Sequence, residues 1–454
     1  MSRIYRTLPP PGTALGIAFS GGLDTRCAVA WLSRQGLKVH CYTADLGQPD
    51  EKSPSDIPPI AMSHGAVSAR LVDCREAIAR EGMIALQCGA FHLATAGRKY
   101  FNTTPLGRAV TTTAIVRAMR EEGVHVFGDG STHKGNDIQR FYRYGILVDP
   151  ELRIYKPWLD QAFVHAFGGR TEMAQYLESI GMPYHMGTEK AYSTDANALG
   201  ATHEAKDLEF LDKGMTIVNP IMGKAFWRPE VAIADEEVTI EIAQGMPVAL
   251  NGERFSTRFG ILDKANEIGG RHGLGMSDQI ENRVIGAKSR GIYEAPGMAL
   301  FHIAYERLLS ATHNEDTTDL YTTLGRKLGR LLYEGKWYDP EAMMLKEALS
   351  RWVATPVSGI VRLALRRGED YSILETRAEQ SAYAPEKLSM EKTAAAFTPE
   401  DRIGALEIQN LAVSDNRSLL MHYADQLGRL SGPAATSFGD VLGEGAADNK
   451  LLGS

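Results

Sequence analysis

The chain has 454 residues, more than a single hydrophobic core usually serves, so we expect two domains. Hydrophobic residues make up 44% and charged residues 23%, a composition typical of soluble globular proteins. The formal net charge of -7 argues against a broad basic surface for nucleic acid, and no apolar run is long enough to span a bilayer.

The N-terminus and the cysteines predict a cytoplasmic protein. Residues 1–12 carry two arginines but no apolar run follows them, so this segment does not resemble a signal peptide. The cysteines are dispersed and form no C-x-x-C pair, so we expect buried, reduced thiols at Cys27, Cys41, Cys74 and Cys88.

Strand and helix signals alternate through the first part of the chain. Short apolar runs predict buried strands at 15–19, 39–44, 69–73 and 124–127. Helical spacing of apolar residues predicts helices at about 24–35, 76–87 and 108–122. This alternation predicts a doubly wound α/β domain with a mostly parallel sheet.

The pattern changes after about residue 185. Alternating apolar and polar residues predict strands near 238–242 and 361–366, and Asn251-Gly252 is typical of a hairpin turn. Helices are predicted at 296–310 and 341–352, so we expect an α+β second domain. The last segment, 431–454, is rich in Gly, Ala and Ser and is expected to be flexible.

The segment Ser20-Gly21-Gly22-Leu23-Asp24-Thr25 joins the first predicted strand to the first helix. Two glycines let the backbone approach a ligand closely, and the start of a helix offers unpaired N–H groups that bind phosphate. Ser20 and Thr25 add hydroxyl donors, and we expect Asp24 to cap the helix. A tight turn without a ligand is the alternative, but the flanking strand and helix favour phosphate binding.

Three common sites are excluded by pattern. No G-x-x-x-x-G-K-[ST] occurs, so a Walker-type phosphate loop is absent. No G-x-G-x-x-G follows the first strand, which disfavours a dinucleotide site. No H-E-x-x-H or cysteine cluster indicates a catalytic zinc, and His203-Glu204 lacks a second histidine at the required spacing.

A second polar segment, 128–137, follows the fourth predicted strand and should lie at the carboxyl edge of the sheet. If a helix starts at Asn136, then Asn136 and Arg140 share one face and Asp137 lies beside them. These groups suit a ligand that has both an amine and a carboxylate. A capped helix with an internal Asp137–Arg140 pair is an equally good interpretation of the residues alone.

At this point the sequence resembles a known family. The Ser20–Asp24 motif is similar to the pyrophosphate loop of N-type ATP pyrophosphatases, a motif that indicates the superfamily but not the substrate. Longer blocks resemble the argininosuccinate synthases, in particular their longer bacterial branch: 100–108, 128–137, 191–195, 201–204 and 269–283. The similarity extends from about residue 12 to about residue 430.

The resemblance implies a ligase that joins citrulline to aspartate through a citrullyl-adenylate, with ATP cleaved to AMP and pyrophosphate and with Mg²⁺ present. It places the chain in arginine biosynthesis and implies a homotetramer, with a C-terminal helix at about 416–430 that reaches across subunits. The implied domains are a nucleotide-binding domain over 1–188, a synthetase and multimerisation domain over 189–430, and a tail over 431–454.

The resemblance also implies site residues. The ATP site would contain Ala18, Phe19, Ser20, Gly21, Gly22, Leu23, Asp24, Thr25, Arg26, Ala44, Gly130, Thr132, Asp137 and Asp195. The aspartate site would contain Thr132, Asn136 and Asp137, and the citrulline site Tyr100, Asn136, Arg140, Ser193, Thr202, Glu204, Glu281 and Tyr293. Asp24, Asn136, Asp137 and Arg140 are the expected catalytic residues, and no protein ligand of the metal is assigned.

One residue departs from the family pattern, which commonly has a small hydroxyl residue where this chain has Arg26. An extra cation near the triphosphate is one interpretation, and an arginine that points to solvent is the one we favour from sequence. His133 could transfer protons, although a positioning or surface role is favoured. The alternative functions are another ATP-pyrophosphatase-type ligase and a nucleotide-binding homologue without catalysis.

Overall fold

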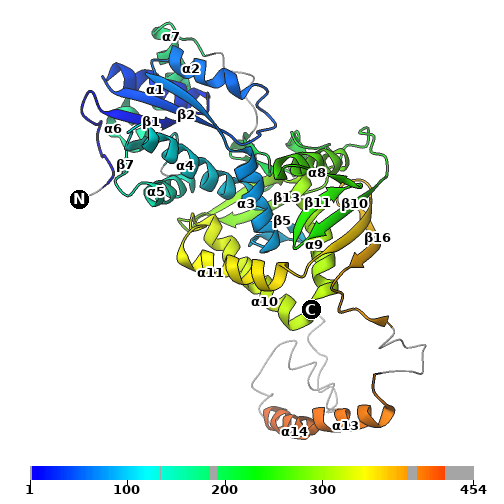
Figure 1. The fold of residues 1–454 in the computed structure, drawn as a ribbon. Helices are drawn as coiled ribbons and strands as arrows, with labels where there is room; N and C mark the ends of the chain where they lie inside the picture. Colours follow the sequence, from blue (N-terminus) through cyan, green and yellow to red (C-terminus); the bar gives the residue numbers. More distant parts are fainter. Residues whose placement is uncertain (1–2, 133, 185–191, 386–395, 425–454) are drawn as a thin grey trace, which may run out of the picture. The chain divides into compact units, whose positions relative to one another are not determined.

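The computed structural model describes residues 3–132, 134–184, 192–385 and 396–424 (Figure 1). The chain forms two compact units, Met1–Ala382 and Tyr383–Ser454. Among the described residues, no helix combines the length and the apolar character that crossing a membrane requires.

A parallel five-stranded sheet lies in the first part of the larger unit. Its order is β3-β2-β1-β6-β7, and its strands are β1 Ala14–Ala18, β2 Lys38–Asp45, β3 Ser68–Asp73, β6 Val126–Gly128 and β7 Arg153–Ile154. The prediction of a mostly parallel sheet is therefore confirmed, although β7 was not anticipated. The strand order reverses between β1 and β6, and ligands of such sheets bind beyond the carboxyl ends at that point.

Helices flank this sheet (Figure 1). They are α1 Leu23–Arg34, α2 Ile57–Ser63, α4 Thr103–Glu121, α5 Asp137–Val148, α6 Gln161–Ala166 and α7 Arg170–Ser179. Helix α3 Arg75–Gln87 packs instead against α4 and against helices of the second part of this unit. The predicted start of α4 at residue 108 was wrong. Pro105 lies in the first turn, where its missing N–H breaks no helical hydrogen bond, so the helix begins earlier, at Thr103.

Two antiparallel sheets follow. The first has the order β13-β14-β9-β8 and consists of β8 Ser193–Asn197, β9 Gly200–Glu204, β13 Met276–Asn282 and β14 Lys288–Glu294. The second has the order β12-β11-β10-β15-β16 and consists of β10 Glu236–Ala243, β11 Met246–Leu250, β12 Glu253–Arg254, β15 Gly359–Leu365 and β16 Tyr371–Ala378. Asn251 and Gly252, with φ of 51° and 81°, make the predicted hairpin turn between β11 and β12.

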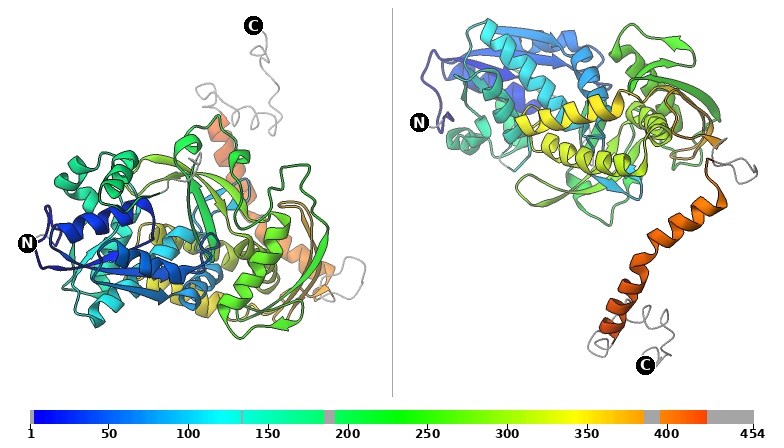
Figure 2. Two further views of the ribbon diagram at one scale, coloured as in Figure 1. Left: turned by 90° about the horizontal axis from the view of Figure 1, so that it is seen from above. Right: turned by 60° about the horizontal axis from the view of Figure 1, so that its bottom comes forward.

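Two helices, α8 Arg258–His272 and α9 Pro296–Thr312, pack against the second of these sheets. Two more, α10 Glu315–Tyr333 and α11 Pro340–Ala348, pack against other helices. A π-helical turn, Leu349–Ala354, continues α11, and α10 and α11 lie side by side (Figure 2). Shorter elements are the β4–β5 ribbon, Ala94–Thr95 and Arg98–Lys99, and the 3₁₀ turns Pro54–Asp56, Pro157–Leu159, Lys206–Glu209 and Met215–Ile217.

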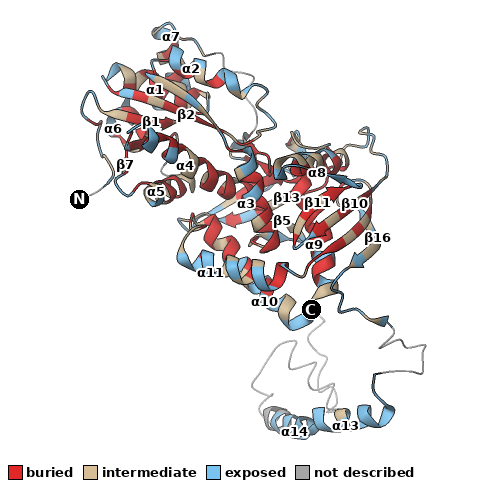
Figure 3. Ribbon diagram, viewed as in Figure 1, coloured by how far each residue is buried: buried red, intermediate tan, exposed pale blue. Residues whose placement is uncertain are grey.

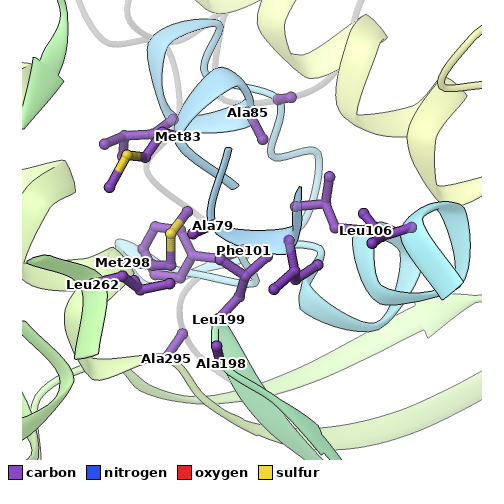
Figure 4. Packing of buried hydrophobic residues seen from close by; sticks show 14 of the residues in the cluster. Ala79, Met83, Ala85, Phe101, Leu106, Ala198, Leu199, Leu262, Ala295 and Met298 are labelled. Atoms are coloured by element: carbon purple, nitrogen blue, oxygen red, sulfur yellow. The ribbon is translucent and has the colours of Figure 1, made fainter. Parts of the chain in front are cut away.

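One large apolar core joins the first part of this unit to the second (Figure 3). Met83 of α3, Leu106 of α4, Leu199 of the β8–β9 turn, Leu262 of α8 and Met298 of α9 all belong to it (Figure 4). Elements that carry polar groups to the site are therefore fixed to one another by burial of apolar surface.

The smaller unit contains α13 Pro399–Gln409 and α14 Leu411–Ala424. Thr398 caps α13 and forms a capping box with Asp401. The helix predicted at 416–430 corresponds in part to α14, whereas 425–430 and the predicted tail at 431–454 lie outside the described residues. The predicted domain boundary at 188/189 also lies outside them.

Candidate active site

Two adjoining cavities lie at the carboxyl edge of the parallel sheet. The first has a volume of about 550 Å³ and lies beyond β1, β2 and β6. The second, of about 260 Å³, is lined by residues of α4, α5, β9, β13 and β14. Arg108, Ser131, Asp137 and Asp195 line both cavities, so a ligand in one can contact a ligand in the other.

The loop between β1 and α1 forms one wall of the first cavity. Gly21 adopts a left-handed φ of +74°, which favours glycine. Thr25 Oγ1 lies 3.3 Å from Ser20 Oγ and donates to the Gly22 carbonyl at 3.2 Å. A Cβ added to Gly130 would lie 3.6 Å from Thr25 Cγ2, so the loop after β6 lies directly against this one.

The prediction that Asp24 caps the helix was wrong. The helix begins at Leu23 with Gly22 as its N-cap, which places Asp24 within the first turn, where it lines the first cavity. Burial raises the pKa of Asp24, and Arg170, 3.8 Å away, opposes this. A carboxylate in this position suits a cation that accompanies phosphate.

Apart from Arg26, the predicted ATP residues fall into three groups. Nine of them line the first cavity: Ala18, Phe19, Ser20, Asp24, Thr25, Ala44, Gly130, Asp137 and Asp195. Gly21 and Gly22 belong to the loop backbone, and Leu23 is buried in a separate apolar cluster that includes residues of β1 and α1. Thr132 lines the second cavity instead.

Arg26 lines neither cavity, and it does not point freely into solvent as the sequence led us to expect. Its Nε donates to the carbonyl of Gly21 at 2.6 Å. Its guanidinium carbon lies 5.2 Å from the centroid of the Tyr184 ring. The local turn, which brings residue 26 back over residue 21, is the physical reason for the difference.

The junction of the cavities is an ion-pair network. Arg108, in α4, donates from Nε to Asp137 Oδ2 at 2.9 Å and from Nη2 to Asp195 Oδ2 at 2.6 Å. Arg140 Nη1 donates to Asp137 Oδ1 at 3.0 Å. Burial acts to raise the pKa of Asp137, but Arg108 and Arg140 outweigh it and lower that pKa. Burial raises the pKa of Asp195, whose ion-pair partner among the described residues is Arg108 alone.

The internal Asp137–Arg140 pair predicted as one interpretation of segment 128–137 is confirmed, its side-chain cap is not, and ligand binding by these residues stays a prediction. The intrahelical pair between Asp137 and Arg140 is present, and the same side chains line the second cavity. Asn136 does not cap α5 with its side chain. It donates to Tyr333 OH at 2.8 Å and accepts from Val284 N–H at 2.9 Å, so it is fixed by α10 and by the β13–β14 turn.

Besides Asp137 and Asp195, the carboxylates of Glu204 and Glu281 and a stacked tyrosine pair line the second cavity. The rings of Tyr100 and Tyr293 lie 3.8 Å apart, and Tyr293 OH donates to Glu281 Oε1 at 3.1 Å. Glu281 Oε2 is buried and has no partner among the described residues. Glu204 is open to solvent within the cavity, yet burial together with Asp137 and Glu281 raises its pKa to about 7. Such carboxylates suit a ligand that carries an ammonium group.

Most predicted amino-acid-binding residues meet in this cavity. Tyr100, Thr132, Asn136, Asp137, Arg140, Thr202, Glu204, Glu281 and Tyr293 all line it. Ser193 does not line it but pairs with Glu204 across β8 and β9, so it lies on the same face of the sheet. His133 lies outside the described residues.

His203 lies on the opposite face of β9 from Glu204. It contacts Glu294 at 2.7 Å and Thr194 at 3.0 Å, and all of its contacts are internal to the fold. Among the described residues, no three His, Cys, Asp or Glu side chains gather in an arrangement that could hold a metal.

The sequence alone assigned no role to four residues near the junction: Arg108, Asp129, Ser131 and Lys156. Arg108 lay within a quoted block, but its partner Asp195 is distant in the chain. Lys156 and Asp129 form an ion pair, both almost fully buried, beneath the loop after β6. Asp129 also accepts from Ser131 N–H at 2.8 Å, and Lys156 lies 3.3 Å from Ser131 Oγ. Only the parallel pairing of β6 with β7 reveals Lys156, which follows β7.

Comparison with known proteins identifies matches across most of the chain. Residues 14–183 match the Arginosuccinate synthase N-terminal HUP domain, and residues 192–415 match the Arginosuccinate synthase C-terminal domain. Among solved structures, a predicted subunit of tRNA methyltransferase from Methanocaldococcus jannaschii has 14% identity over 39% of this chain and 94% of its own, with a TM-score of 0.23. A likeness at that TM-score supports no inference.

Proposed function

The chain belongs to the argininosuccinate synthase family and is therefore a ligase of arginine biosynthesis, and we propose that it forms the C–N bond between L-citrulline and L-aspartate while ATP is cleaved to AMP and pyrophosphate. The observation that supports this most is the junction of the two cavities at Arg108, Asp137 and Asp195. A nucleotide in the first cavity and an amino acid in the second would meet there.

In this proposal the pyrophosphate end of ATP lies against Ser20–Thr25. The hydroxyls of Ser20 and Thr25 and the N–H groups at the start of α1 donate to its oxygens. Asp24 fits as a ligand of Mg²⁺, because its carboxylate faces the cavity and Mg²⁺ held mainly by phosphates needs few protein ligands. The metal would neutralise phosphate charge, and the protein groups orient the α-phosphorus toward the junction.

Citrulline occupies the second cavity. Its ammonium group would pair with Glu204 and with Glu281, whose Oε2 has no hydrogen-bond partner in the described part of the chain. Thr132, Asn136 and Asp137 would hold aspartate on the side nearer the first cavity. The chain supplies positioning and charge rather than a covalent intermediate, and such positioning can account for a large part of a rate enhancement.

The proposed reaction proceeds in two steps. The ureido oxygen of citrulline attacks the α-phosphorus, the bond to the bridging oxygen breaks, and pyrophosphate leaves. The aspartate amine then attacks the ureido carbon and loses a proton, and the C–O bond breaks to release AMP. The ureido oxygen therefore ends in the phosphate of AMP.

We also propose the domain division at 188/189, a cytoplasmic location and a homotetramer. Exposed apolar side chains on α13 and α14 support the last of these, since such residues are expected at contacts between copies: Ile403, Leu406, Ile408, Leu411 and Val413.

The experiment uses purified protein with Mg-ATP and citrulline labelled with ¹⁸O at the ureido oxygen. Release of AMP and pyrophosphate should require citrulline and, for sustained turnover, aspartate, and the label should appear in AMP. Formation of ADP would overturn the proposal, and turnover without citrulline would indicate a different ligase. No turnover under any of these conditions would indicate a homologue without catalysis.

A further inference from the structure

We propose that Arg26 is a positioning residue, which holds the peptide between Gly21 and Gly22 in the orientation that binds the pyrophosphate end of ATP. This inference rests on the proposed function, because it concerns the same phosphate loop. It assigns to Arg26 a role that requires no contact with the nucleotide.

The contacts of Arg26 fix its guanidinium from two sides. Nε donates to the Gly21 carbonyl at 2.6 Å, a short hydrogen bond of the charge-assisted kind. The ring of Tyr184, which follows α7, lies 5.2 Å from the guanidinium carbon, within the range of a cation–π interaction. The side chain is half-buried and lines neither cavity, so it can act on a nucleotide only through the loop or through its charge.

The loop has a peptide that such a contact can control. Glycine occupies positive and negative φ with similar ease, so a peptide between two glycines can turn over at little energetic expense. Gly21 has φ of +74° in the observed orientation. Because a trans peptide is planar, its C=O and N–H point in opposite directions. The hydrogen bond from Arg26 therefore selects one of two accessible orientations.

The selected orientation directs an N–H toward the cavity side of the loop. Gly22 N–H points toward Ser20 Oγ, which lines the first cavity, at a distance of 3.4 Å. This distance is long for a hydrogen bond, so the N–H remains available to a phosphate oxygen. With the peptide turned over, the carbonyl oxygen of Gly21 would take that place and repel phosphate.

The alternative is that Arg26 attracts phosphate by its charge alone. A cation in the first turn of a helix opposes the helix dipole, which itself favours anions there. The two explanations differ in what they require: peptide positioning needs the donor at Nε, whereas attraction by charge needs only a positive group.

The principal variant is Arg26→Ser. If the correct peptide orientation falls to about a tenth of the population, the apparent affinity for Mg-ATP falls about ten-fold. We expect the KM for Mg-ATP to rise about five- to ten-fold, with kcat and the KM values for citrulline and aspartate near those of the wild type. Inhibition by pyrophosphate should weaken by the same factor, while inhibition by AMP, which lacks the β- and γ-phosphates, should not change.

The matched control is Arg34→Ser, which removes an exposed arginine from the last turn of the same helix. It should leave every constant unchanged. Arg26→Lys keeps the charge without a donor at the Nε position and should stay impaired. Tyr184→Leu leaves the loop sequence intact, so it carries the test if Arg26→Ser fails to fold, and it should raise the KM for Mg-ATP about two- to three-fold.

Three results would overturn the inference: an unchanged KM for Mg-ATP in Arg26→Ser, full recovery in Arg26→Lys, or equal weakening of inhibition by pyrophosphate and AMP. Each of these can be obtained only with an active wild type. If the wild type releases no AMP and pyrophosphate, the proposed function fails instead, so the two failures are distinguishable.

Discussion

Arg108→Met is the perturbation that best tests the junction of the two cavities. It removes the guanidinium that donates to Asp137 at 2.9 Å and to Asp195 at 2.6 Å. The two carboxylates then repel each other without the cation between them. Removing one partner of a fully buried pair costs about 3–5 kcal/mol, whereas an exposed pair contributes about 0–1 kcal/mol. The side chain of Arg108 is 19% exposed and that of Asp195 is 39% exposed, which places this network between the two cases.

We therefore expect Arg108→Met to lower the free energy of unfolding by roughly 2–3 kcal/mol. Urea denaturation of the ligand-free protein measures this loss. The unbalanced carboxylates lie where phosphate and citrulline would meet, so kcat/KM for citrulline should fall by about a hundred-fold, which corresponds to about 3 kcal/mol. Arg117→Met, which removes an exposed arginine from the same helix, is the control.

A double-mutant cycle separates the ion pairs from general damage to α4. Adding Asp195→Asn to Arg108→Met removes one of the stranded carboxylates, so the double variant should be more stable than the sum of the single losses predicts. Arg108→Lys should be intermediate, because one ammonium cannot bond two carboxylates as a planar guanidinium does. Additive losses, or wild-type activity in Arg108→Met, would refute the network as described.

Three further predictions follow from single contacts. The pKa of Glu204 is raised to about 7 from 4.5, so its contribution to stability should be present below about pH 4.5 and be lost as the pH rises through 7. Glu204→Gln should abolish this decline, so its melting temperature should exceed that of the wild type at about pH 8 but not at about pH 4. Equal pH profiles of the two proteins would contradict this. Lys156→Met should lower the free energy of unfolding, measured by chemical denaturation, by about 3–5 kcal/mol. Adding Asp129→Asn should recover part of this loss, and no recovery would contradict the importance of the ion pair. Tyr293→Phe removes the hydroxyl that donates to Glu281 Oε1. The KM for citrulline in steady-state assays should therefore rise about ten-fold while the KM for ATP stays constant, and a rise in both would indicate general distortion.

Local sequence patterns were sufficient to predict the secondary structure around the phosphate loop. The strand–turn–helix signal around Ser20–Thr25 predicted β1 and α1, because an apolar run, two glycines and helical spacing are all local properties of the chain. The second loop and the start of α5 followed in the same way. The precise cap was missed, since Gly22 rather than Asp24 holds that position.

Local sequence patterns did not predict strands β8 and β13, which contribute residues to the second cavity. Strands β8 and β13, with the sequences STDAN and MSDQIEN, are too polar to show a clear apolar alternation. Asp195 of β8 and Glu281 of β13 line the second cavity rather than an apolar core, so the usual pattern of a half-buried strand is lost there. The contacts of Arg26 and Lys156 also depend on backbone geometry that no residue pattern specifies.

The junction of the cavities has a consequence for how this enzyme can be divided or recombined. Arg108 and Asp137 come from the segment that matches the N-terminal family domain, whereas Asp195, Glu204 and Glu281 come from the segment that matches the C-terminal one. Neither half alone contains all of these cavity-lining groups. Because one apolar core spans both halves, a chimaera with a distant relative needs a matched core in order to fold. Even when it folds, it should turn over poorly unless the exchanged half keeps Arg108 in register with the carboxylate at position 195.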